Sequence, residues 1–400
     1  MQKYIIYNPH GGSEGHSQEY STQLCLGLLK NGIMVHLVTL RDFNPQEVFN
    51  KGASVTFADV NKYQSVMLRY DSWLSKILYG LVIAKNNLKG FLALNQAEKE
   101  QKPNVCLIIG GETITNLIYI LWMGAVSKIR YGLTIHNSDF NLSLYKKDRV
   151  KLIYKLMSKC LLKVAIKFNG LLFVHGKSMQ QSLAQSLNTS TKKIRFYHVP
   201  CERKQISSKK VRKVTKTSIR LLFCGIIRSD KGFDDLCGAL QLCKPHKNWT
   251  LRVAGSPTQV GSKYIYRHLT NNKIESRTTL KLKYLSLEEI DNEYHNADIV
   301  VLPYKKSFIA QSVVMTDAVK WRKPVITTAH SQNGYSTTKY KLGWTFKSED
   351  RQDLAKVLCK AIACLKIKKS HFNFDLFLKD HDPGFVGKQI IRGFSMARTE

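Results

Sequence analysis

The chain has 400 residues and carries 62 Lys and Arg against 29 Asp and Glu, which gives a formal net charge of +33. A hydrophobic fraction of 44% and a charged fraction of 23% exclude whole-chain disorder, and 9 Pro with 24 Gly exclude collagen-like and linker-like chains. The length predicts two or three domains, and the positive charge predicts a polyanionic partner: nucleic acid, anionic lipid or a phosphorylated small molecule.

Short apolar or β-branched runs alternate with helical stretches along the first half of the chain. The expected strands are residues 4–7, 34–39, 105–109, 131–135, 171–174 and 194–199, and the expected helices include 18–30, 114–126 and 144–168. Such alternation is typical of a parallel sheet with helices on both faces.

A basic stretch at residues 203–216 separates this half from the next, where the alternation restarts. It holds seven Lys and Arg and no acidic or aromatic residue, which predicts an exposed linker. The expected strands beyond it are 219–224, 250–254, 280–284, 299–302 and 324–328, and the expected helices are 231–242, 287–295 and 312–321.

The predicted fold class is α/β, with two Rossmann-like, doubly wound parallel-sheet domains that face each other across a cleft. The expected division is an N-terminal domain at 1–200, a basic linker at 201–218, a C-terminal domain at 219–380 and a C-terminal helix at 381–400. That last helix either closes the second domain or crosses back to the first.

The cysteines and the apolar runs predict the cellular compartment of the protein. The nine cysteines are odd in number and form no C-x-x-C pair, which predicts reduced thiols in the cytosol. Residues 1–7 lack the apolar middle of a signal peptide. The most apolar stretch, 105–126, is interrupted at 110–113, so we expect a strand, a turn and a buried helix instead of a membrane span.

Two candidate ligand-binding turns follow strands of the N-terminal half, at the strand ends where α/β proteins bind ligands. Gly11 and Gly12 form the first, because paired glycines let backbone amides approach an anion. A plain tight turn is the alternative, and the dinucleotide pattern G-x-G-x-x-G is absent. His136 follows the strand at 131–135, where a structural role and a role in the site are both open.

Two further turns lie in the C-terminal half. Gly225 ends the strand at 219–224, and the cations Arg228 and Lys231 then stand three residues apart, suited to gripping a diphosphate. Surface charge is the alternative. Ser312 is an expected N-cap that leaves the amides of Val313 and Val314 open to a phosphate.

Asp317, one and a half helical turns beyond Ser312, suits the vicinal hydroxyls of a ribose better than a metal ion. A helix-capping role is the alternative for this acid.

These last two turns, in this order and separation, resemble those of glycosyltransferase family 4, retaining enzymes with the GT-B fold, and in particular its bacterial surface-polysaccharide type. The matching residues are Gly225, Arg228, Lys231, Gly232, Asp317, Ala318, Pro324 and Val325, and residues 296–303 look like the family's Ala-Asp-x-x-x-x-Pro strand. His136 aligns with the family's histidine near the transferred sugar, and Gly11 and Gly12 with its donor-side glycine turn.

The resemblance implies a nucleoside diphosphate sugar as donor. Arg228, Lys231 and the amides after Ser312 would stabilise the departing diphosphate, His136 would contact the transferred sugar, and Asp317 would anchor the ribose. No protein nucleophile, cofactor or metal ion is implied.

The sequence departs from the family pattern at several positions. Asp317 replaces a Glu, Ile309 stands where the paired acid is expected, and Arg322 stands where the family has Gly. Val313 occupies the place of a small residue. These departures leave open a GT-B protein without transferase activity, acting as a partner subunit or a sugar epimerase.

The Asp-His-Asp run at 380–382 has the form of the metal-binding motif of GT-A enzymes. Because it stands near the C-terminus, before Pro383, we expect a loop with helix-capping acids there instead of a metal site.

A stripe of lysines marks the helix expected at 144–168. They recur every fourth residue, with aliphatic residues between them, which favours an interfacial helix on an anionic bilayer over a simply solvated helix. The six are Lys147, Lys151, Lys155, Lys159, Lys163 and Lys167. We therefore expect peripheral binding to an anionic membrane. The family resemblance adds a lipid-linked saccharide as acceptor and the cytoplasmic face of the inner membrane as the location.

Nucleic acid is the less favoured polyanion. The sequence holds no recognisable RNA- or DNA-binding motif, and its lysine stripe is paired with aliphatic side chains instead of aromatic residues that stack on bases.

Overall fold

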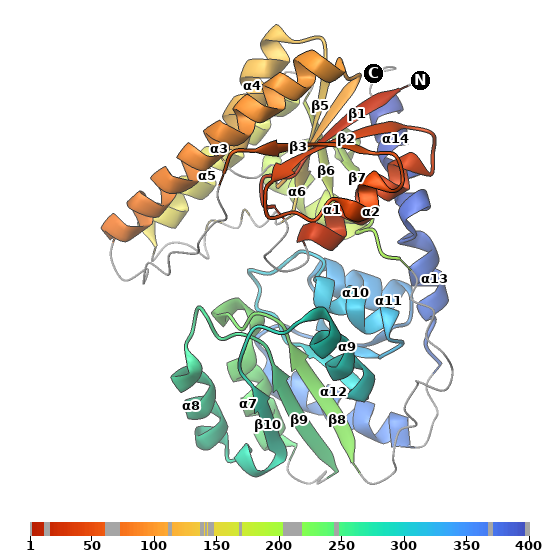
Figure 1. The fold of residues 1–400 in the computed structure, drawn as a ribbon. Coiled ribbons are helices and arrows are strands. Elements are labelled where there is room, and N and C mark those ends of the chain that lie inside the picture. The colour runs from red at the N-terminus through yellow and green to blue at the C-terminus, as the bar shows by residue number, and fades with distance from the viewer. Residues whose placement is uncertain are drawn as a thin grey trace. The chain divides into compact units, whose positions relative to one another are not determined.

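The computed structural model describes residues 2–11, 17–60, 73–110, 114–136, 140, 142, 148–167, 170–202, 218–243, 248–366 and 371–396. The chain divides into two compact units, which are described separately (Figure 1). The N-terminal unit comprises Met1–Glu202 with Asp380–Glu400, and the C-terminal unit comprises Arg203–Lys379. The basic stretch at 203–216 lies outside the described residues.

The N-terminal unit is built on a seven-stranded parallel sheet in the order β3-β2-β1-β4-β5-β6-β7. Its strands are β1 (Lys3–Tyr7), β2 (Met34–Leu40), β3 (Ser54–Ala58), β4 (Val105–Ile109), β5 (Arg130–Ile135), β6 (Leu171–Val174) and β7 (Ile194–Phe196). The strand order reverses between β1 and β4, and this reversal opens a crevice at the carboxyl ends of the strands in doubly wound folds.

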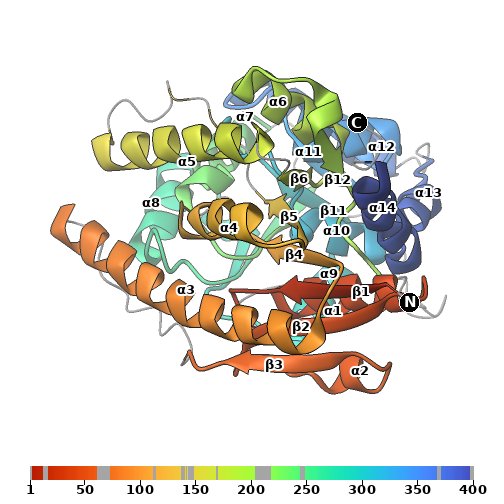
Figure 2. The same cartoon turned by 90° about the horizontal axis from the view of Figure 1, so that it is seen from above.

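Helices cover both faces of this sheet. The helices are α1 (Ser17–Leu29), α2 (Gln46–Phe49), α3 (Trp73–Gln101), α4 (Ile114–Val126), α5 (Arg149–Lys167), α6 (Lys177–Leu187) and α14 (Pro383–Met396). Figure 2 shows α4 between α3 and α5. On the other face α1 packs against α14 and shares one apolar core with it. A Cβ on Gly387 would lie 2.2 Å from the carbonyl oxygen of Gly27, so the two helices touch at their glycines.

The C-terminal unit holds a six-stranded parallel sheet in the order β10-β9-β8-β11-β12-β13. Its strands are β8 (Ile219–Cys224), β9 (Trp249–Ala254), β10 (Thr278–Lys281), β11 (Ile299–Leu302), β12 (Val325–Thr328) and β13 (Gly343–Phe346). Its helices are α7 (Phe233–Leu242), α8 (Ser262–Asn272), α9 (Leu287–Asn296), α10 (Val313–Lys320), α11 (Gln332–Lys339), α12 (Arg351–Lys366) and α13 (Phe374–Asp380). The two doubly wound parallel sheets confirm the predicted α/β class with two Rossmann-like domains.

Some predicted boundaries were wrong, mostly at the sheet edges. The strand expected at 194–199 ends at Phe196, because the amide of His198 leaves the sheet to donate to Gln389 Oε1 on α14, at 3.0 Å. The strand expected at 280–284 is β10, which starts at the polar Thr278 and pairs through Lys281. The edge strands β3 and β13 and the long α3 were missed altogether.

The apolar stretch at 105–126 holds the predicted strand and helix, but the helix is not buried as expected, because Ile118 and Trp122 are 54% and 61% exposed. It forms the fully buried β4 and then α4. No helix in the described part of the chain is both long and apolar enough to cross a membrane. All nine cysteines are free thiols.

Candidate functional site

Two of the predicted turns meet at the carboxyl edge of the C-terminal sheet. Gly225, with φ +105°, follows β8, and a Cβ there would lie 3.2 Å from Val314 Cγ2 in the first turn of α10. Gly255, with φ +143°, follows β9, and its Cβ would lie 1.9 Å from the carbonyl oxygen of Gly225. Gly255 has no room for a side chain and Gly225 has a backbone conformation that favours glycine, so the two glycines let the β8 turn lie close to the start of α10.

Lys231 lies against two aromatic rings beside this turn. Its Nζ is 3.7 Å from the ring centroid of Tyr304 and 4.1 Å from that of Phe308. Burial, assisted by the charge of Arg228, lowers the pKa of Lys231 to about 7. Within the described residues no carboxylate forms an ion pair with this ammonium. An approaching anion stabilises a buried ammonium of this kind more than it stabilises an exposed lysine, because water screens the charge less.

Arg228 is held in place by its neighbour Asp230. The guanidinium donates from Nε to Asp230 Oδ1 at 2.9 Å and from Nη2 to Oδ2 at 2.7 Å. This bidentate pair fixes the plane of the guanidinium, so Arg228 is oriented before any ligand binds.

The N-terminus of α10 is open to an anion. Ser312 is its N-cap residue, as predicted, but its hydroxyl does not cap the helix and instead shares a hydrogen bond of 3.0 Å with Tyr304 Oη. Its amide donates to Asn333 Oδ1 at 2.8 Å. The amides of Val313 and Val314 in the first turn have no intrahelical acceptor, and no acid precedes or follows them in that turn.

By contrast, α7 begins with Asp234 and Asp235 in its first turn. Those acids already occupy the positive end of that helix, so α10 offers the better anion site of the two.

Asp317 lies in the middle of α10 and does not cap it. It is buried, and its Oδ1 is 3.5 Å from Lys320 Nζ, one turn along. Burial, and after it the charge of Asp317, raises the pKa of Cys224 at the end of β8.

The departure at Arg322 has a clear backbone consequence. Arg322 adopts φ +54°, the left-handed conformation that favours glycine. Its guanidinium donates to both carboxylate oxygens of Asp375 on α13, at 3.2 and 2.8 Å.

In the N-terminal unit the turns after β1, β2 and β4 converge. Gly11 has φ +64°, and a Cβ on it would lie 2.0 Å from Asp42 Oδ1, just beyond β2. Gly110 has φ +69°, and a Cβ there would lie 2.5 Å from His10 Nε2. Gly12 lies outside the described residues.

His136 stands at the same sheet edge, directly after β5. Its Nδ1 is 3.0 Å from Nε2 of His175, which directly follows β6. Burial lowers the pKa of His136 to about 4 and that of His175 well below its usual range. We did not predict His175 as a site residue, although it follows an apolar strand just as His136 does.

The expectation of helix-capping acids at 380–382 is confirmed for Asp382. Its Oδ1 accepts from the amides of Gly384 at 2.8 Å and Phe385 at 3.2 Å, at the start of α14. In the described ranges no group of three His, Cys, Asp or Glu residues could hold a metal ion.

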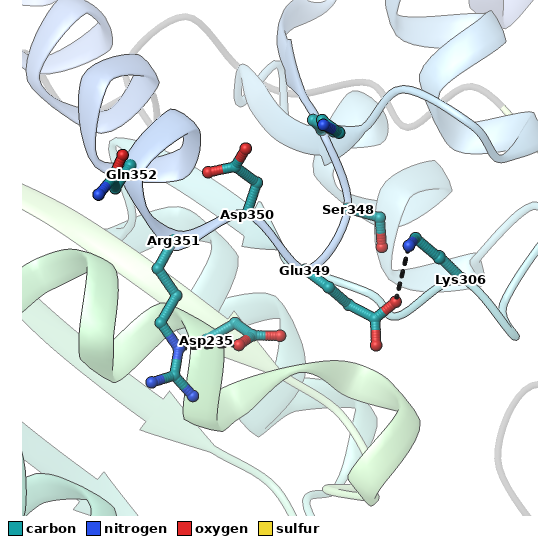
Figure 3. Close-up of a pocket in the computed structure, with 8 residues that line it drawn as sticks. Asp235, Lys306, Ser348, Glu349, Asp350, Arg351 and Gln352 are labelled. Atoms are coloured by element: carbon teal, nitrogen blue, oxygen red, sulfur yellow. Dashed lines mark hydrogen bonds and ion pairs between the residues drawn. The ribbon is translucent and has the colours of Figure 1, made fainter.

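A cavity of about 530 Å³ lies beside α7 and the start of α12 (Figure 3). Much of its charge is already paired: Arg351 Nε lies 3.0 Å from Asp235 Oδ1, and Lys306 Nζ lies 3.8 Å from Glu349 Oε2. We therefore do not assign the diphosphate to this cavity.

The helix with the lysine stripe presents apolar as well as basic side chains to solvent. The described side chains of Lys155 and Lys159 are half-buried and those of Lys163 and Lys167 are exposed, whereas Lys147 and the side chain of Lys151 lie outside the described residues. We call the exposed apolar residues of α3, α4 and α5 the apolar face; they are Leu81, Leu88, Leu92, Ile118, Trp122, Val150, Ile153, Tyr154, Leu156, Met157 and Val164.

Residues 204–371 match the family described as Glycosyl transferases group 1. The C-terminal unit is a glycosyltransferase domain. No curated protein matches the sequence.

Solved structures cover the whole chain. Sucrose-phosphate synthase from Thermosynechococcus elongatus superposes with a TM-score of 0.73 at 13% identity, over 100% of both chains. HepE from Anabaena, in complex with UDP and glucose, gives 0.63 at 13% identity over 99% of this chain and 100% of its own. WaaG, a glycosyltransferase involved in lipopolysaccharide biosynthesis, gives 0.63 at 13% identity over 98% of each chain. The chain therefore has the GT-B fold and, with its matched domain, is a glycosyltransferase.

Proposed function

We propose that this glycosyltransferase moves a sugar, with retention of configuration, from a nucleoside diphosphate sugar to a lipid-linked saccharide. The acceptor would lie at the anionic cytoplasmic face of the inner membrane, in the biosynthesis of a surface polysaccharide such as O-antigen, capsule or exopolysaccharide. The observation that supports the donor half is the link between Lys231 and the N-terminus of α10. Lys231, which has no carboxylate partner among the described residues, lies over the ring of Tyr304, and the hydroxyl of Tyr304 bonds to the N-cap residue Ser312.

The donor half follows from the charges that surround this position. Negative charge develops on the diphosphate as the sugar leaves, and preorganised cations and amides stabilise it most where water is excluded. Lys231 and the oriented Arg228 would supply the cations, and the first turn of α10 would supply the amides. Tyr304 connects these parts, because its ring faces Lys231 and its hydroxyl bonds to Ser312.

Two further side chains complete the proposed donor contacts. Asp317, on the same helix as the phosphate-binding amides, would accept hydrogen bonds from the ribose hydroxyls. His136 would contact the transferred sugar as a neutral imidazole, because its pKa of about 4 keeps it uncharged at neutral pH. The UDP and glucose bound by HepE support a nucleotide sugar as donor for this chain.

The acceptor half is supported by the surface of α3, α4 and α5. The apolar face includes Trp122, which is 61% exposed, and Leu92, which is 64% exposed. Exposed apolar side chains beside lysines are typical of a surface that binds the interface of an anionic bilayer. The lipopolysaccharide role of WaaG supports an acceptor of this kind.

Thermal-shift measurements with a panel of nucleoside diphosphates and their sugars test the donor half. We expect one nucleotide to raise the melting temperature of the native chain and to lose that effect in Lys231→Ala. Lys306→Ala is the matched control, because the side chain of Lys306 is 60% exposed. Equal responses of both variants would contradict the proposed donor site.

A further inference from the structure

The carboxyl ends of β5 and β6 carry a pair of histidines that the donor contacts do not explain. The strands pair in parallel with Ile135 opposite Val174, so the next residues, His136 and His175, are neighbours. Their ring centroids are 4.9 Å apart, and His175 is buried with 3% of its surface exposed. The bond of 3.0 Å joins His136 Nδ1 to His175 Nε2.

A hydrogen bond between two neutral imidazoles has two possible directions, and only one of them is present at a time. A neutral ring has one N–H donor and one lone-pair acceptor, so one histidine must donate and the other must accept. Burial lowers the pKa of both rings, which leaves both neutral at pH 7. The tautomer of His136 is therefore coupled to the tautomer of His175, and it determines whether Nε2 of His136 donates or accepts.

A chain of buried hydroxyls lies behind His175. Tyr20 Oη on α1 is 3.4 Å from His175 Nε2 and 2.6 Å from Tyr197 Oη. Tyr197 Oη is in turn 2.7 Å from Thr134 Oγ1 on β5. Burial raises the pKa of Tyr197 far above its usual range, so its hydroxyl keeps its proton. This chain holds the His175 ring between α1 and the sheet, which restricts its rotation.

We propose that His175 is a positioning residue that sets which ring nitrogen of His136 carries the proton, with Tyr20 and Tyr197 holding His175 in place. Its catalytic consequence rests on the proposed function, in which His136 contacts the transferred sugar. The coupling of the two rings does not require a donor or an acceptor to be bound.

A matched pair of variants separates this role from simple packing. The side-chain nitrogen of His175→Gln reaches the position of Nε2, whereas His175→Asn ends near the position of Nδ1. Ring ¹⁵N resonances, recorded on the full chain without ligand and assigned by their loss in His136→Ala, report the tautomer of His136. We expect one dominant tautomer in the native chain and in His175→Gln, and a mixture in His175→Asn.

The kinetic measurement uses one donor, which the thermal-shift assay selects from UDP-glucose, UDP-N-acetylglucosamine and GDP-mannose. We expect kcat to fall about 10- to 100-fold in His175→Asn, to stay within about threefold in His175→Gln, and the donor KM to stay within about twofold in both. An unchanged tautomer in His175→Asn, or an equal loss of kcat in the two variants, would overturn the proposal. Full activity of His136→Ala would instead contradict the proposed function, and the ring spectra would still decide the coupling.

Discussion

Both carboxylate oxygens of Glu98 lie 3.0 Å from the hydroxyl of Tyr131, in the core of the N-terminal unit between α3 and β5. Burial raises the pKa of Glu98 to about 7, and the hydrogen bonds from Tyr131 and Cys106 only partly oppose this rise. The folded protein therefore keeps a neutral carboxylic acid in its interior up to neutral pH.

This acid predicts a pH-dependent effect of Glu98→Gln. Between about pH 4.5 and 7 the folded state binds more protons at Glu98 than the unfolded state does, so this group's contribution to stability falls as the pH rises through that window. Glutamine does not ionise. We expect Glu98→Gln to raise the free energy of unfolding by about 1–3 kcal/mol at pH 8 relative to its effect at pH 4.5.

Urea denaturation at the two pH values measures this difference. Glu100→Gln, at an exposed position of the same helix, is the control and is expected to show no comparable pH dependence. An effect of Glu98→Gln that is the same at both pH values would rule out the buried acid as its cause.

Lys231 predicts the opposite pH dependence. Because its pKa is lowered to about 7, the unfolded state binds more protons at this position between about pH 7 and 10.5, and this group's contribution to stability rises with pH there. Removing the charge therefore stabilises the folded protein most at low pH. We expect Lys231→Met to raise the free energy of unfolding by about 1–3 kcal/mol at pH 6.5, with the gain shrinking towards pH 10.

The same variant is expected to lose nucleotide binding, so stability and binding change in opposite directions. Parallel denaturation and titration calorimetry of Lys231→Met and the control Lys306→Met would show this. A loss of stability at pH 6.5 would mean that the contacts with Tyr304 and Phe308 outweigh the cost of burying the charge.

Two substitutions of Arg322 distinguish the effect of backbone strain on stability from the effect of the ion pair. Arg322→Gly loses the pair with Asp375 but relieves the left-handed backbone, whereas Arg322→Ala loses the pair and keeps the strain. We expect the Gly variant to be more stable than the Ala variant by about 1 kcal/mol, as measured by thermal denaturation. Equal stability of the two variants would show that φ at this position relaxes without cost.

Vesicle flotation tests the membrane surface. We expect Lys163→Glu with Lys167→Glu to reduce binding to phosphatidylglycerol vesicles at least about tenfold, at roughly 1 kcal/mol per cation with charge reversal, and to leave nucleotide binding unchanged. Ile153→Ser with Met157→Ser is expected to weaken binding through the apolar face.

The control for vesicle binding is Lys356→Glu with Lys360→Glu, on α12 of the other unit. Binding that these α12 changes reduce as strongly would assign the attraction to net charge instead of to α5.

The sequence alone was sufficient to predict the two Rossmann-like units. Buried parallel strands are continuous apolar runs, so their first and last residues can be identified without knowing which strands they pair with. The strands at 105–109, 171–174, 219–224 and 299–302 were predicted to the residue. Edge strands such as β3 and β10 were missed or misplaced, since a strand with one neighbour tolerates polar residues. The glycine and cation spacing after β8 was likewise readable in the sequence, because a tight turn and a local pair of charges depend on near neighbours.

Contacts between distant segments were decided only by the tertiary structure. Nothing local to Lys231 predicts the rings of Tyr304 and Phe308, more than seventy residues away, that surround its ammonium. His136 and His175 become partners only because β5 and β6 pair in register. The +33 charge behaves in the same way: the composition fixes its total, but a cation's burial and partners depend on which elements pack around it.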